Sequence, residues 1–185
     1  FAVAVIAEAR QPAKVPRIGL LGNSASTNPA RNEAFRQGLR DLGYVEGKNI
    51  GIEWRFWEGK QDRQRPMAAE LARLKVDVIV AVGTGDIRAA KEASATIPIV
   101  MISGGDAVGS GLVASLARPG GNITGLATLR PELSGKRLEL LREIVPGLSR
   151  VAVFVSANSA DHGQLLKELD LASGTLGVKL QSLDI

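Results

Sequence analysis

Short apolar runs alternate with amphipathic helical patterns along most of the 185 residues. The run from 76 to 82, VDVIVAV, is apolar on both faces, which is typical of a central strand in a parallel sheet. The alternation predicts βα units and an α/β fold, built on a mostly parallel sheet. In this first stretch we expect strands at 17–21, 50–56, 76–82, 98–102 and 122–126, and helices at 29–42, 65–74, 87–94 and 111–117.

The pattern restarts after Pro131, with helices expected at 132–145 and 161–176 and strands at 150–155 and 178–185. Two strands with two helices make a poor independent core, because a small isolated sheet is only marginally stable. We therefore predict a first α/β lobe over 14–128 and the opening part of a second, similar lobe over 129–185.

The N-terminal segment 1–13 has a pattern of its own. An apolar run, Phe1–Ile6, precedes Ala7-Glu8-Ala9, in which small residues alternate as they do at a signal-peptidase site. This favours the remainder of a secretory signal and hence an exported protein. A first strand is the alternative interpretation, because strands also carry such runs.

Composition removes several function classes. The absence of Cys excludes disulfides, thiolate zinc sites and thiol catalysis, and the single histidine, His162, argues against a His-centred triad or metal site. The formal net charge is +4, but the basic residues are interspersed rather than clustered. We expect no catalytic residue, no metal, no cofactor and no nucleic-acid partner.

In an open parallel sheet, ligands bind beyond the carboxyl ends of the strands. The loops expected at that edge are rich in small and hydroxyl residues. Ser24, Thr84 and Ser103 can each donate a hydrogen bond to a carboxylate, and Asp106 can pair with an ammonium group. This set would suit a zwitterion such as an amino acid.

Structural interpretations stand beside these functional ones. The sequence Gly83-Thr84-Gly85 also fits a tight turn and a helix N-cap, and Asp106 also fits a cap of the following segment. His162 is expected on a solvated surface. The aromatic cluster of Trp54, Phe56 and Trp57 is expected in core or edge packing.

Two longer stretches, FRQGLRDLGYVEGKN over 35–49 and LARPGGNITG over 116–125, resemble the substrate-binding proteins of ABC importers. They are most similar to the subgroup that includes binders of tryptophan and other aromatic amino acids. The resemblance extends from about residue 14 to 185. It implies two flavodoxin-like lobes, with helices on both faces of each parallel sheet, that close around a ligand.

The resemblance also implies a set of ligand-binding residues. Two loops that carry these residues differ from the family pattern, because Gly85 and Ala107 stand where proline is common in members. The second-lobe loop Ser156–Ser159 differs further. The implied positions are Ser24, Ala25, Gly83, Thr84, Ser103, Asp106 and, from the second lobe, Asn158.

The expected function is therefore that of a periplasmic carrier, which closes on a small molecule by a hinge motion and delivers it to an ABC permease. Two alternatives remain open: the effector-binding domain of a transcriptional regulator, and an enzyme on a doubly wound α/β fold. The whole protein is expected to be a monomer, whereas the 185-residue chain alone could dimerise.

Overall fold

A computed structural model describes residues 14–26, 29–128, 132–156 and 162–184. The predicted signal segment 1–13 and the predicted contact Asn158 lie outside these ranges, so both stay predictions. None of the helices within these ranges is long and apolar enough to cross a membrane.

The elements in order are β1 (Arg17–Gly22), α1 (Pro29–Asp41), β2 (Gly51–Phe56), a 3₁₀ turn (Gln61–Arg63), α2 (Gln64–Arg73), β3 (Val78–Val82), α3 (Thr84–Ala93), β4 (Ile99–Gly104), β5 (Ile123–Ala127), α4 (Glu132–Ile144), β6 (Arg150–Val155), α5 (His162–Leu176) and β7 (Lys179–Asp184).

The first five strands form one sheet in the order β2-β1-β3-β4-β5, and every neighbouring pair is parallel. In its centre, Leu20 of β1 pairs with Trp54 on one side and with Val80 on the other. The parallel sheet predicted from the alternating pattern is confirmed. Its strands all end at one edge, so the loops that follow them lie at the same end of the lobe.

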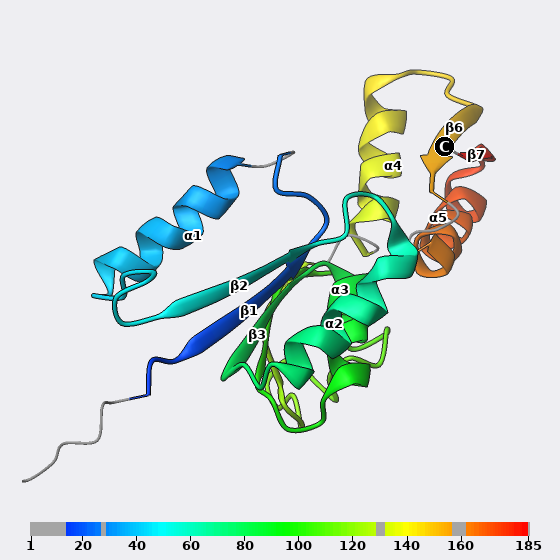
Figure 1. The fold of residues 1–185 in the computed structure, drawn as a ribbon. Coiled ribbons are helices and arrows are strands. Elements are labelled where there is room, and N and C mark those ends of the chain that lie inside the picture. The colour runs from blue at the N-terminus through cyan, green and yellow to red at the C-terminus, as the bar shows by residue number, and fades with distance from the viewer. Residues whose placement is uncertain (1–13, 27–28, 129–131, 157–161, 185) are drawn as a thin grey trace, which may run out of the picture.

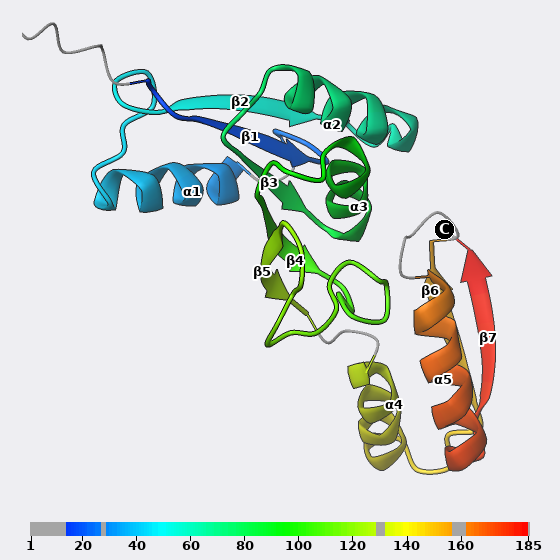
Figure 2. The ribbon, with the colours of Figure 1, turned by 90° about the horizontal axis from the view of Figure 1, so that it is seen from below.

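Helices cover both faces of this sheet, with α1 on one face and α2 and α3 on the other (Figures 1 and 2). The strands alternate accordingly: Leu21 and Ile79 pack with Leu71 of α2 and Ile87 of α3. Leu20 and its neighbours on the opposite face pack with Phe35 and Leu39 of α1. Most of the buried apolar side chains lie on the α2–α3 face of the sheet. Full burial of a side chain such as Leu71 contributes about 1.5–3 kcal/mol.

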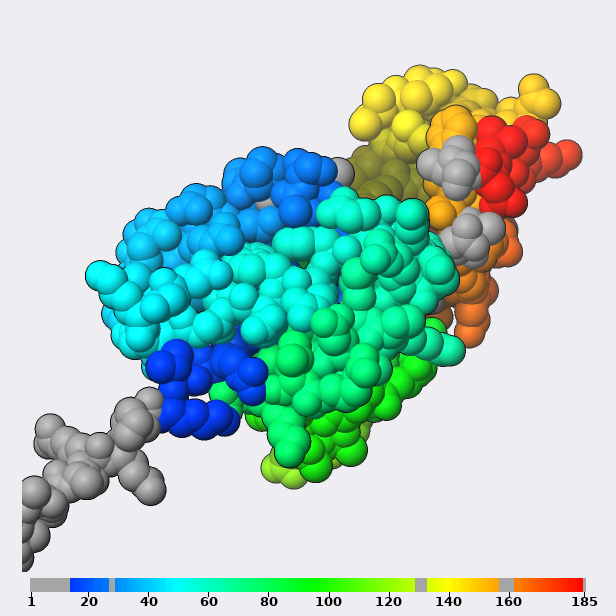
Figure 3. Space-filling view, viewed as in Figure 1, coloured from blue at the N-terminus to red at the C-terminus, as the bar shows by residue number. Residues whose placement is uncertain are grey.

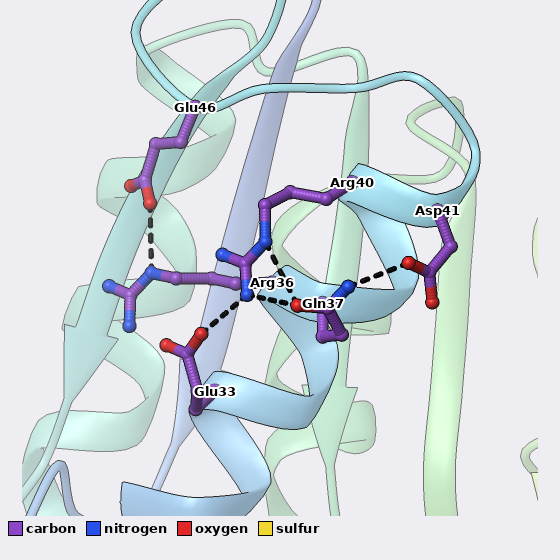
Figure 4. A network of polar contacts seen from close by, with 6 residues as sticks. All are labelled: Glu33, Arg36, Gln37, Arg40, Asp41 and Glu46. Carbon is purple, nitrogen blue, oxygen red and sulfur yellow. Dashed lines mark hydrogen bonds and ion pairs between the residues drawn. The ribbon is translucent and has the colours of Figure 1, made fainter.

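Helix α1 packs on the sheet through partly buried side chains, and none of its residues is fully buried. Figure 4 shows its surface network, in which Arg40 binds Glu33 at 2.5 Å and Arg36 binds Glu46 at 2.9 Å. The Arg36 guanidinium also lies 4.4 Å from the ring centre of Trp54, a cation–π contact with β2. In the space-filling view α1 (blue) lies beside the segment that contains β2 (cyan) (Figure 3).

The helix predicted at 111–117 is wrong. This segment is a series of turns in which the amides of Leu112 and Val113 both donate to the carbonyl oxygen of Ala107. Gly111 has a φ of +70°, a left-handed conformation that interrupts any helix begun at this point. Leu112 and Val113, which suggested a helix, are buried in this loop, whereas Leu116 is exposed.

The helix expected at 87–94 begins three residues earlier, at Thr84. Gly83 has a φ of +93°, which lets the chain turn directly from β3 into α3 without strain. Because glycine disfavours helix, Gly85 made the first turn look like a loop.

Residues 132–156 and 162–184 form a second unit, in which β6 and β7 pair in parallel and α4 packs on α5. Gly135 lies against Ala172, so the two helices approach closely at this point. Large apolar side chains such as Phe154 and Ile144 remain 67% and 76% exposed. The boundary at 128/129 and the division into two lobes stay predictions.

Candidate ligand-binding site

A cavity of about 270 Å³ opens at the carboxyl edge of the first sheet, between the strands and α1. Its walls are mainly apolar and aromatic, and its polar groups come from the β1 loop and from the first turn of α1. Arg31 is the cation of this wall; it is exposed and makes no hydrogen bond or ion pair to any residue in the described ranges. Such a pocket can hold a small molecule that has an apolar body and an anionic group. The lining residues are Leu20, Gly22, Asn23, Ser24, Arg31, Asn32, Phe35, Phe56, Val82 and Ile102.

The predicted contacts Ser24 and Ala25 lie in the loop that follows β1, and both donate to a glutamate. The Ser24 hydroxyl donates to Oε2 of Glu58 at 2.6 Å, and the Ala25 amide donates to Oε1 at 3.2 Å. These hydrogen bonds hold the pKa of Glu58 below its usual value, the Ser24 bond most strongly. Ser24 also lines the cavity, so this loop connects the cavity to a carboxylate-binding pair of donors.

Gly83 and Thr84 form the junction between β3 and α3. Thr84 is 5% exposed, and its hydroxyl oxygen accepts a hydrogen bond from the amide of Gly105 at 2.9 Å. The junction is therefore tied to the loop after β4. The ligand contact predicted for Thr84 stays a prediction, and in this structure its side chain supports the neighbouring loop.

Ser103 is the second-to-last residue of β4, and Asp106 lies in the loop that follows this strand. Ser103 is exposed, has a φ of +54°, and its hydroxyl makes no hydrogen bond within the part of the chain that the structure describes. Asp106 is half-buried, and its Oδ1 accepts hydrogen bonds from the amides of Val108 at 3.2 Å and Gly109 at 2.8 Å. Ser103 is thus available to a ligand, whereas Asp106 already stabilises its own turn.

The structure brings the predicted loops to one edge but not into one cavity. Among the predicted residues, Ser24 lines the cavity; Val82 and Ile102, which also line it, directly precede Gly83 and Ser103. The wall residues Arg31, Phe35 and Phe56 were not predicted as contacts. The position of Phe56 at the carboxyl end of a strand was the available signal.

The buried carboxyl group of Asp86 lies close to this edge of the sheet, and the sequence analysis did not select it. Asp86 lies in the first turn of α3, is 2% exposed, and accepts a hydrogen bond from the indole of Trp57 at 2.8 Å. Burial raises its pKa to about 7, although contacts with Trp57 and Gln64 oppose this rise. Its other oxygen, Oδ2, is buried and makes no hydrogen bond of ordinary geometry to a described residue.

Comparison with known proteins identifies the class. Residues 25–185 match the family described as ABC transporter substrate binding protein. The chain belongs to this family of substrate-binding proteins. A tyrosine-binding protein of Clostridioides difficile is 32% identical over 130 residues, which cover 70% of this chain and 37% of that protein.

Solved structures of other proteins have a similar fold. A conserved domain protein from Vibrio cholerae superposes with a TM-score of 0.83 at 28% identity, over 93% of this chain and 58% of that chain. A streptococcal ABC domain in complex with L-Trp has a TM-score of 0.80 at 22% identity, over 92% of this chain and 57% of that chain, and shows the fold alone. The flavodoxin-like lobe predicted from the resemblance is confirmed. The chain spans little more than half the length of these structures.

Proposed function

We propose that the protein containing this chain is the extracytoplasmic solute-binding component of an ABC importer. It binds an amino acid or a similar zwitterion between two lobes, without chemical conversion, and presents it to the membrane permease. The observation that carries this proposal is the cavity beside Ser24, in a chain of this family, at the sheet edge where the loops after β1, β3 and β4 meet.

The chemistry of the first lobe supports an amino-acid ligand. Hydroxyl and amide donors at Ser24, Ala25 and Ser103 suit a carboxylate, and the walls formed by Phe35 and Phe56 suit an apolar or aromatic side chain. The tyrosine-binding relative is consistent with this class. Export is supported by the family and by the signal-like segment 1–13.

Calorimetric titration of the whole protein with tyrosine, tryptophan, phenylalanine and leucine tests the proposal. We expect at least one of them to bind and to be recovered unchanged. Replacement of Ser103 with alanine should weaken that binding about tenfold, the effect of losing one hydrogen bond to a charged group. Ser149→Ala is the matched control, because this exposed serine precedes the amino end of β6. Equal affinity of the Ser103 variant and the wild type would remove Ser103 from the site, and conversion of the ligand would contradict a carrier.

A further inference from the structure

A carboxylate of the protein itself occupies the two donors that the β1 loop offers to a ligand. Glu58 binds through both oxygens, one to the Ser24 hydroxyl at 2.6 Å and one to the Ala25 amide at 3.2 Å. A free carboxylate ligand would use the same pair of contacts. We call the Ser24 hydroxyl and the Ala25 amide the carboxylate clamp.

The backbone around Glu58 is built onto the β1 loop. The amide of Trp57 donates to the carbonyl oxygen of Gly22 at 3.1 Å, and the amide of Glu58 donates to that of Asn23 at 2.6 Å. The amide of Gly59 donates to the Asn23 side chain at 2.9 Å. Glu58 itself has a φ of +49°, an unfavourable conformation for a residue with a side chain, so the tertiary contacts maintain it. These contacts hold the Glu58 backbone next to the clamp.

The donors of the clamp are also oriented. The amide of Ser26 donates to the Ser24 oxygen at 3.2 Å, and this oxygen has one hydrogen, which it gives to Glu58. The amide of Ala25 likewise has a single hydrogen. Both donors are therefore used by Glu58, and a second carboxylate cannot take them while the first remains.

The contact also fixes the charge of Glu58. Its two hydrogen bonds lower the pKa, so the side chain is ionised at neutral pH. A ligand carboxylate that approaches the clamp therefore meets a negative charge as well as occupied donors. Yet Glu58 is exposed, and its side chain can rotate into solvent without leaving a cavity.

We propose that the clamp is the carboxylate site of the first lobe and that Glu58 is its specificity-determining residue, a resident competitor that an incoming ligand carboxylate displaces. The inference rests on the proposed function and deepens it. The adjoining cavity, which Ser24 also lines, then receives the remainder of the ligand. Glu58 thereby lowers the affinity for weak carboxylate ligands and leaves the clamp occupied when no ligand is bound.

Two probes test this proposal on the whole protein: acetate, which has only the carboxylate, and tyrosine. The amide resonance of Ala25 is followed by NMR during acetate titration at constant ionic strength, and tyrosine affinity is measured by calorimetry. In Glu58→Ala we expect acetate to shift the Ala25 resonance at about tenfold lower concentration than in the wild type, and tyrosine to bind about tenfold more tightly. Glu92→Ala, which removes an exposed glutamate paired with Arg65, is the control and should behave as wild type.

The outcomes separate this inference from the proposed function. An equal acetate response in Glu58→Ala and wild type overturns the inference. If wild type binds tyrosine, weaker or unchanged tyrosine affinity in Glu58→Ala overturns it too. Weaker affinity would mean that Glu58 pairs with the ligand's ammonium group. If acetate binds the variant clamp more tightly while neither protein binds tyrosine, the carboxylate site stands and tyrosine is not the ligand.

Discussion

Replacement of Asp86 with asparagine is expected to stabilise the protein at pH 8 by about 2–4 kcal/mol and to have little effect at pH 4. The reason is the burial of this carboxyl group, which is 2% exposed and has one oxygen without an ordinary hydrogen bond to a described residue. An ionised carboxylate is costly in such a place, and asparagine keeps an acceptor for the Trp57 indole.

The sign of the pH dependence follows from the raised pKa. The folded protein releases the Asp86 proton near pH 7, whereas the unfolded chain releases it near 3.8. Between these values the folded state binds more protons, so the contribution of Asp86 to stability is full below pH 3.8 and is lost as the pH rises to about 7. At 1.36 kcal/mol for each pH unit, the full loss is about 4 kcal/mol.

Urea denaturation at several pH values measures this effect. Carboxylates with a lowered pKa, such as Asp77 and Glu70, act in the opposite direction, so the comparison is between wild type and Asp86→Asn at each pH. Asp62→Asn, on the exposed 3₁₀ turn, serves as the control and should follow the wild type. A constant difference between Asp86→Asn and wild type from pH 4 to pH 8 would contradict the account.

Replacement of Gly125 with alanine is expected to destabilise the protein by at least about 3 kcal/mol. Gly125 pairs with Met101 between β5 and β4, and its φ is +132°. A Cβ atom there would lie 2.2 Å from the Met101 carbonyl oxygen, inside any permitted contact distance. The backbone of the sheet edge would have to move, because the obstructing atom is not a flexible side chain.

Gly121→Ala is the matched control. Gly121 is exposed, lies four residues earlier in the same stretch, and would place its Cβ in open space. Its effect should stay within about 0.5 kcal/mol. Denaturation midpoints of the two variants measure the contrast, and similar midpoints would show that β5 does not require glycine at this position.

The sequence predicted the elements whose pattern is local. The strand at 150–155 and the helix from 132 have the expected positions because their periodicity is undisturbed. The loop at 111–117 was mistaken for a helix, because apolar residues such as Leu112 and Val113 are buried by turns as well as by helices. Backbone conformations such as the positive φ of Gly111 leave no periodic signal.

The site was predictable in its separate parts but not in its connections. Parallel topology places the loops after β1, β3 and β4 at one edge, so Ser24 and Ser103 could be selected from the sequence alone. The contact of Ser24 with Glu58 joins residues 34 positions apart, and that of Trp57 with Asp86 joins residues 29 positions apart. Such pairs depend on the tertiary fold, and no spacing rule marks them.

The most direct test of the central claim, that this edge of the sheet contributes to an amino-acid site, is native mass spectrometry of the whole protein. The protein is incubated with a mixture of the twenty common amino acids, freed of excess ligand and then denatured. The account predicts retention of a single amino acid at one molecule per protein, released intact on denaturation and retained less by Ser103→Ala. A protein that retains none of the twenty, or retains them equally after this substitution, would contradict it.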